Sequence, residues 1–251
     1  SLNDPSRYQN NFEFIKFAID KFELSNNVDL LNSLLHIAAQ FGQINIINMI
    51  MDLSSDETKD QIFNNETVIM SVIFIALQNN AASNFIYRLC ELNKELINTN
   101  LIEFATERKY YKLILDLLEL TKDSKLITMD LITALINDNE YLYISNIYNL
   151  NLIENMFDSE DLTDEDGYKP IHVAIYNNNS NMIAALCKID SGNYSYKESS
   201  NLSPIELAFV LKSNDDVIFK LIHPNNIDTP IKYQSNQCYI LHAAIKLGYA
   251  S

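Results

Sequence analysis

The sequence predicts an all-α fold in which about seven helix–turn–helix repeats, joined by short hairpin loops, stack into an α-solenoid. The first supporting observation is composition. Leu and Ile recur at helical spacing, while the 251 residues include only 4 glycines and 5 prolines. The second is self-similarity at a fixed period, which is the sequence signature of repeat architectures. One helix pair of this size cannot bury its apolar face alone, so the pairs are expected to stack into a continuous core.

The repeat is clearest around Pro170 and Pro204, which lie 34 residues apart. Their surroundings are KPIHVAIYNNNSNMIAALCKI and SPIELAFVLKSNDDVIFKLI. Each predicts a helix with Pro at its first position, a polar corner and a second apolar helix. The same shape appears in LLHIAAQFGQINIINMIMDL and, near the end of the chain, in ILHAAIKLGYA. One position therefore recurs in four copies, as His36, His172, Glu206 and His242.

Three weaker copies fill the interval between His36 and His172, which spans 136 residues, or four periods. Their predicted helix pairs cover residues 73–80 and 84–93, 102–109 and 111–120, and 132–139 and 141–150. Steps of 29 residues separate Phe74, Glu103 and Ile132, with steps of 38 and 40 on either side, so some hairpins are trimmed and others extended. A small residue in each first helix would let neighbouring first helices approach closely: Ala38, Ala76, Ala105, Ala134, Ala174, Ala208 and Ala244.

The two ends of the chain are expected to differ from the middle. Residues 1–29 are assigned to an N-terminal capping helix, because residues 11–24 are amphipathic and fit the second helix of a cap. The repeats occupy residues 30–251, and the last copy stops after its first helix. Such an end would leave an apolar face uncovered, which predicts that the chain is a fragment of a longer protein.

The copies resemble the ankyrin repeat, whose pattern is roughly a glycine, Thr-Pro-Leu-His, two alanines, a second glycine and a second helix. The matching residues are Gly167, Pro170, Ile171, His172 and Ala174 in one copy, His36, Ala38, Ala39 and Gly42 in another, and His242, Ala243, Ala244 and Gly248 in a third. The second to fourth copies lack the Thr-Pro and the His. The resemblance implies that His36, His172 and His242 bond the backbone across adjacent repeats. These positions, with Pro170, Pro204 and Glu206, are therefore expected to be structural.

Charge and cysteine usage argue against several classes of partner. The formal net charge is −15, with 33 acidic against 18 basic residues, whereas nucleic acid and anionic lipid are bound by clustered Lys and Arg. The most apolar run, residues 67–77, is shorter than the roughly 20 residues that span a bilayer, so no membrane insertion is expected. Cys90, Cys187 and Cys238 form no CxxC pair, so neither a disulfide framework nor a zinc site is predicted. A reducing, cytoplasmic location is expected.

No catalytic, cofactor-binding or metal-binding residue is predicted, and the chain is not expected to be an enzyme. The sequence lacks a Gly-rich phosphate loop, a G-x-S-x-G motif and an H-E-x-x-H motif. The acidic run DSEDLTDED at residues 158–166 lacks the Gly that a calcium loop places at its sixth position. It is either a solvated loop or an acidic patch that meets a basic partner, and both interpretations stay open. Cys90 and Cys187 are interpreted as small buried hydrophobes.

The ankyrin resemblance also implies a partner-binding side, formed by the hairpin tips and the exposed face of the first helices. Carried over position by position, the candidates are Asp166, Tyr168, Tyr176 and Asn177 in the fifth copy, Leu202, Val210 and Leu211 in the sixth, and Lys246 and Leu247 in the seventh. Tyrosine is favoured in binding surfaces, and Tyr194 and Tyr196 lie near Tyr168 and Tyr176 in the sequence. Packing of these tyrosines between helices is the alternative.

These features predict a non-catalytic protein–protein interaction module or scaffold that binds another protein, perhaps one with a basic patch, through the concave face of the repeats. Asn and Ile are abundant and have AT-rich codons, and the repeats are divergent. Both features suit an effector that an intracellular pathogen secretes into the host cell, and a protist or viral ankyrin protein nearly as well. The alternative is a targeting or substrate-recruiting arm of a larger enzyme whose catalytic domain lies outside this chain. Fold does not decide between these functions.

Overall fold

The computed structural model describes residues 5–79, 83–153, 162–164, 166–190, 197, 202–223, 226–228, 230–233 and 236–248. Within these ranges, the side chains of residues 5–11, 232, 233, 236–238, 241, 246 and 247 lie outside the description. Apart from one short β-hairpin, the regular structure of the described residues is helical, which confirms the predicted all-α class. The chain divides into two compact units, Ser1–Thr121 and Lys122–Ser251, and each is described by itself.

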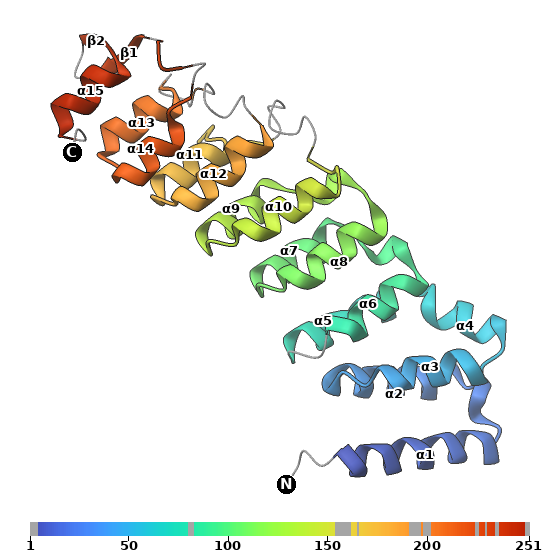
Figure 1. Cartoon of the computed structure of the whole chain (residues 1–251). Helices are drawn as coiled ribbons and strands as arrows, with labels where there is room; N and C mark the ends of the chain where they lie inside the picture. The colour runs from blue at the N-terminus through green and yellow to red at the C-terminus, as the bar shows by residue number, and fades with distance from the viewer. Residues whose placement is uncertain are drawn as a thin grey trace. The chain divides into compact units, whose positions relative to one another are not determined.

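The first unit holds eight of the α-helices in Figure 1, from blue to green. They are α1 Pro5–Lys21, α2 Val28–Phe41, α3 Ile44–Leu53, α4 Asp56–Phe63, α5 Glu66–Gln78, α6 Ser83–Leu92, α7 Thr99–Glu107 and α8 Tyr111–Thr121, with short 3-10 turns at Leu24–Asn26 and Lys94–Leu96. Helix α2 packs against α3 and α5, α3 packs against α6, and α6 packs against α8. Each helix of a pair therefore contacts its own partner and a helix of a neighbouring pair.

The second unit continues the same pattern of helix pairs. Its helices are α9 Met129–Asn137, α10 Tyr141–Asn149, α11 Pro170–Tyr176, α12 Ser180–Ile189, α13 Pro204–Leu211, α14 Asp215–Leu221 and α15 Ile240–Leu247, with a 3-10 turn at Ser124–Leu126. Helix α11 packs against both α9 and α13, and α12 packs against both α10 and α14. Strands β1 Pro230–Tyr233 and β2 Asn236–Tyr239 form an antiparallel hairpin that pairs Pro230 with Tyr239.

Asparagine side chains start many of these helices. In each case the side-chain oxygen accepts a hydrogen bond from the backbone N–H three residues on, as at Asn27, Asn65, Asn98, Asn179 and Asn214. A cap of this kind stabilises a helix by about 1 kcal/mol relative to alanine. The abundance of Asn in the sequence therefore has a physical role in starting helices.

Apolar side chains at helical spacing line the interior. In α8, Leu113, Ile114, Leu117 and Leu118 are all buried, at intervals that place them on one side of the helix. Burying one such side chain contributes about 1.5–3 kcal/mol relative to leaving it exposed. The pairing of helices follows from this stripe, because a single short helix leaves it open to water.

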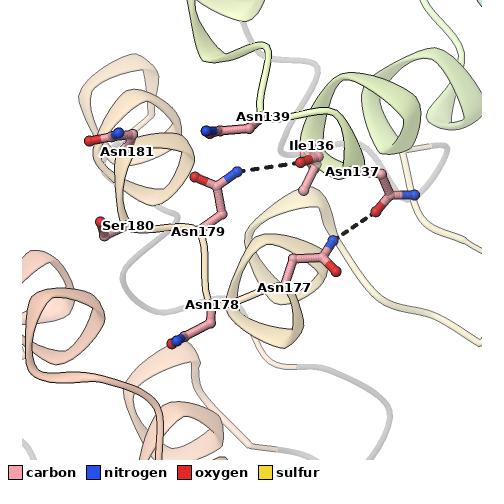
Figure 2. A pocket seen from close by; sticks show the side chains of 8 residues that line it. All are labelled: Ile136, Asn137, Asn139, Asn177, Asn178, Asn179, Ser180 and Asn181. Atoms are coloured by element: carbon pink, nitrogen blue, oxygen red, sulfur yellow. Dashed lines mark hydrogen bonds between the residues drawn. The ribbon is translucent and has the colours of Figure 1, made fainter.

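Five helix pairs in the described part of the chain reverse direction through the same backbone turn. In each, an N–H donates to the carbonyl five residues earlier at 2.8–3.0 Å: Gln43 to Ala38, Tyr110 to Ala105, Glu140 to Leu135, Asn179 to Ala174 and Ser213 to Ala208. The residue before the donor is left-handed, with φ between 54° and 63°: Gly42, Lys109, Asn139, Asn178 and Lys212. These features define a Schellman motif. Figure 2 shows the neighbouring turns that carry Asn139 and Asn178.

The turns correct the predicted register of one weak copy. Four of the five accepting carbonyls belong to predicted alanines. In the remaining turn, after α9, the carbonyl belongs to the buried Leu135 rather than to the half-buried Ala134. The spacing from Ala105 is therefore one residue longer than the equal steps in the sequence suggest. The turn that would follow Ala76 lies partly outside the described residues.

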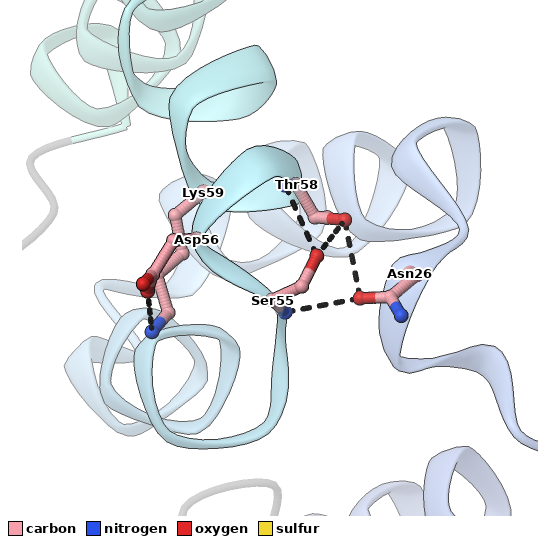
Figure 3. Close-up of polar contacts among 5 residues, drawn as sticks. All are labelled: Asn26, Ser55, Asp56, Thr58 and Lys59. Atoms are coloured by element: carbon pink, nitrogen blue, oxygen red, sulfur yellow. Dashed lines mark hydrogen bonds and ion pairs between the residues drawn. The ribbon is translucent and has the colours of Figure 1, made fainter.

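Helix α4 is a second difference from the prediction, and it accounts for the wide step of 38 residues between the first two copies. Its sequence, DETKDQIF, is polar and buries only Thr58, Ile62 and Phe63, so it lacks a clear apolar pattern. Side-chain hydrogen bonds fix its start, as Figure 3 shows. The Asn26 side-chain oxygen accepts from the Ser55 N–H at 3.0 Å and from the Thr58 hydroxyl at 3.1 Å, and Ser55 Oγ accepts from the Thr58 N–H at 3.3 Å.

Two further elements depart from the sequence prediction. The first helix spans Pro5–Lys21 rather than residues 11–24. The β-hairpin at residues 230–239 stands where only a short loop was expected, and the side chain of Ile231 in β1 is buried. Strand β1 contacts α13, and β2 leads directly into α15. The hairpin therefore packs against the last described helix pair.

Helices α11 and α13 begin in the same way although their third residues differ chemically. Each has Pro at its first position, where the missing N–H leaves no bond unmade. His172 Nδ1 accepts a hydrogen bond from the Lys169 N–H at 3.1 Å. Glu206 Oε2 accepts from both the N–H and the hydroxyl of Ser203, each at 2.8 Å. Imidazole and carboxylate thus fill one role, which explains why Glu stands where other copies have His.

The first prediction concerns the left-handed turn at Lys212. A residue with a Cβ in this conformation costs about 1–2 kcal/mol, while glycine loses about 0.5–1 kcal/mol more backbone entropy on folding. We expect Lys212→Gly to raise the free energy of unfolding by about 0.5 kcal/mol, measured by urea denaturation. The matched control is Lys188→Gly in α12, an exposed right-handed position where glycine should destabilise. A loss of stability in both variants would contradict the strain at Lys212.

The second prediction tests the equivalence of His172 and Glu206. Glu206→Ala removes a nearly buried acceptor, 8% exposed, from the Ser203 N–H and hydroxyl, and should lower the unfolding free energy by about 1–2 kcal/mol. Glu206→His should recover part of that loss, because an imidazole makes the same backbone bond in α11. Thermal unfolding of the two variants checks this. Equal destabilisation by Ala and His would refute the shared role.

Candidate partner-binding surface

Exposed apolar side chains gather at the ends of two neighbouring first helices in the second unit. Tyr176 in α11 is 47% exposed, and Val210 and Leu211 in α13 are 55% and 41% exposed. Tyr176 and Val210 are each the seventh residue of their helix, and α11 packs directly against α13. We call Tyr168, Tyr176, Val210 and Leu211 the α11–α13 surface. Apolar side chains in this arrangement are typical of interaction sites.

Tyr168 and Tyr176 form an aromatic pair on this surface. Their ring centroids are 5.2 Å apart at an interplanar angle of 69°, and the Tyr176 hydroxyl donates to the Tyr168 hydroxyl at 3.2 Å. The Tyr168 ring also lies edge-on to the buried His172, with centroids 6.4 Å apart. The same histidine caps α11, so the cap and the aromatic pair support each other. Tyr194 and Tyr196 lie outside the described residues.

An acidic turn positions Tyr168. The Asp164 carboxylate accepts hydrogen bonds from the Tyr168 N–H at 2.7 Å and from the Asp166 N–H at 3.1 Å. Gly167 takes up a left-handed backbone with φ 81°, and the Asp164 N–H donates to the Tyr168 carbonyl at 3.0 Å. Asp166, a predicted contact residue, is exposed at this turn. Of the acidic run, residues 158–161 and 165 lie outside the described residues.

The other predicted contact residues are placed less uniformly. Asn177 is exposed and donates its amide to the Asn137 side-chain oxygen at 2.7 Å. Leu202 is half-buried, and the side chains of Lys246 and Leu247 lie outside the described residues. Sequence reasoning missed Ile245 in α15, which is 65% exposed. Its position one residue before Lys246 could have drawn attention to it.

The histidines of the repeat occupy one position counted from the helix end and different positions counted from the start. His36, His172 and His242 each lie six residues before the left-handed residue that ends the helix. His172 and His242 are third residues of their helices, whereas His36 lies deep inside the longer α2. His36 therefore cannot cap a helix start, and its Nδ1 donates to the Asn32 carbonyl at 2.7 Å.

The bonding implied by the ankyrin resemblance is met differently at each histidine. His36 Nε2 reaches the next helix pair, but it lies 2.8 Å from the Ser71 hydroxyl in α5 rather than from a backbone group. The backbone bond of His172 to Lys169 lies at the start of its own helix. His242 is exposed and lies beside the Tyr239 ring, with centroids 5.9 Å apart.

Few groups in the described residues could carry chemistry. No cluster of three or more His, Cys, Asp or Glu among them could hold a metal ion. Burial raises the pKa of the Cys90 thiol to about 12, which leaves it uncharged and unreactive near neutral pH. Cys187 is also buried, and the side chain of Cys238 lies outside the described residues.

No helix in the described part of the chain combines the length and the apolar character needed to cross a bilayer.

Comparison with known proteins finds no matching family model, no matching curated protein and no matching solved structure. The role of the α11–α13 surface must therefore be inferred from its own geometry.

Proposed function

We propose that the chain is a non-catalytic protein-interaction module of the ankyrin type, and that it binds another protein through the α11–α13 surface. The observation that carries this proposal is the exposure of Tyr176, Val210 and Leu211 at equivalent ends of two helices in contact. Exposed apolar area of this kind gains free energy when a partner removes it from water.

The ankyrin-type solenoid is supported by features that recur from one helix pair to the next. Five pairs share the same turn bond, and two share Pro at the first helical position with a third-residue side chain folded back onto the helix start. Within the second unit, the first helices α9, α11 and α13 contact in sequence, as do the second helices α10, α12 and α14. This order is the one that a stack of helix pairs requires.

The aromatic pair suits the surface to binding. Tyr176 and Tyr168 offer large contact area, and their mutual packing and hydroxyl bond hold them in place before a partner arrives. Ordering side chains on binding costs about 0.5–1.5 kcal/mol for each one immobilised, so a preformed pair lowers that cost. Tyrosine is also among the residues that most often dominate interface energetics.

Charge favours a partner with a basic patch. Asp164 and Asp166 lie at the turn beside Tyr168, and the chain as a whole carries a net charge of −15. Complementary charge speeds encounter and disfavours acidic competitors. Delivery into a host cell, where such a partner would be met, remains part of the proposal and is supported only by the AT-rich composition and the divergent repeats.

The third prediction tests this surface with the whole chain as bait in a eukaryotic lysate. We expect a specific partner whose binding is weakened about thirtyfold by Tyr176→Ala combined with Val210→Asp, as for loss of an interface hot spot. Capture should persist at high salt if the apolar residues dominate, because salt screens only exposed charge. The dissociation constant is measured by titration with the purified partner.

The matched control is Phe219→Ser, which removes a large exposed side chain from α14 in the other helix layer. Binding should survive this change. A partner lost equally with Phe219→Ser and with the paired variant would place the interface elsewhere. A partner insensitive to both would count against the α11–α13 surface.

A further inference from the structure

We propose that a cleft lined by asparagine side chains binds the main chain of an extended, uncharged peptide segment. The cleft has a volume of about 380 Å³ and lies between the α9–α10 turn and the α11–α12 turn, as Figure 2 shows. Six of its eight lining residues are asparagine, and the other two are Ile136 and Ser180. We call it the asparagine cleft. It goes beyond the proposed function, because its ligand is held by amides rather than by the apolar α11–α13 surface.

Hydrogen bonds between the two turns hold part of the lining in place. The Asn177 amide donates to the Asn137 side-chain oxygen at 2.7 Å, and the Asn179 amide donates to the Ile136 carbonyl at 3.3 Å, as Figure 2 shows. The Asn179 side-chain oxygen meanwhile accepts from the Met182 N–H at 3.0 Å. These side chains are therefore ordered in advance, which lowers the entropy that binding must cost.

Other amide groups of the cleft keep their bonding capacity. The side chains of Asn139 and Asn181 are exposed and make no hydrogen bond to a described residue. The Asn137 amide nitrogen and the Asn177 side-chain oxygen are likewise without a bond to the described residues. A primary amide carries two donors and one acceptor oxygen, so the cleft presents donors and acceptors side by side.

This chemistry matches an extended polypeptide. In an antiparallel ladder, one residue exchanges both an N–H and a C=O bond with its partner, so both groups point to the same side. The oxygen and nitrogen of a single Asn amide can meet that pair as a neighbouring strand would. Recognition then depends on main-chain groups and leaves the peptide's side chains free.

The lining also argues against other ligand classes. The cleft has no ionisable residue in its wall, although the chain carries 33 acidic and 18 basic residues, so charge does not select the ligand. It has no aromatic ring on which the face of a sugar could pack. A neutral ligand with alternating donors and acceptors remains, and a peptide main chain fits that description.

The fourth prediction uses a library of end-blocked linear peptides, selected against the whole chain. Asn139→Gly keeps the left-handed backbone at φ 61° while removing the amide, and Asn181→Ala removes the second free amide. We expect this paired variant to weaken the selected peptides about tenfold, as for loss of two hydrogen bonds. Replacing one main-chain amide of the bound peptide by an ester should weaken binding about fivefold, because an N–H donor is lost.

The matched control is Asn146→Ala, which removes an exposed amide from α10 outside the cleft and should leave the affinity unchanged. Three results would overturn the proposal. The first is a failure to select any peptide that depends on Asn139 and Asn181. The second is binding that tolerates ester replacement throughout the peptide. The third is binding of neutral oligosaccharides that the paired variant abolishes. None of these changes touches Tyr176 or Val210, so failure here is distinguishable from failure of the α11–α13 surface.

Discussion

The turn between the two helices of a pair is the constraint on which the rest of this structure depends. Its defining bond joins an N–H to the carbonyl five residues earlier, and it requires one residue with positive φ. That bond fixes where the first helix ends and where the second begins. It thereby decides which residue of the first helix faces solvent at its end. Tyr176 and Val210 are both placed two residues before a left-handed residue, so their exposure has a common cause.

The start of each helix is controlled by a second set of bonds, and here geometry matters more than residue type. His172 and Glu206 both accept a backbone N–H at the start of a proline-led helix. With the start and the end both fixed, α11 and α13 differ in length by only one residue. Equivalent side chains therefore fall at equivalent heights on two helices in contact. The α11–α13 surface follows from this matched length.

The sequence carries enough information for the class and most helix pairs, because apolar spacing survives even in the weak copies. Helix α4 escapes notice since three buried side chains in a polar octet form no pattern, and its start depends on Asn26, far away in sequence. The register at Leu135 is set by turn geometry rather than by composition. Of the candidate site, Tyr176, Val210 and Leu211 could be placed by analogy with the repeat. The Tyr168–Tyr176 pairing and the amides between Asn137 and Asn177 depend on tertiary distances that spacing does not encode.

The left-handed turn position has a consequence for how such a chain can change over time. Glycine occupies it at residue 42, while lysine and asparagine occupy it elsewhere, and the chain follows the same path in each case. A replacement at this point costs little and stays local, because the side chain points away from the packed helices. Mutational drift can therefore remove the glycines that make the repeat visible in sequence while the helix pairs persist.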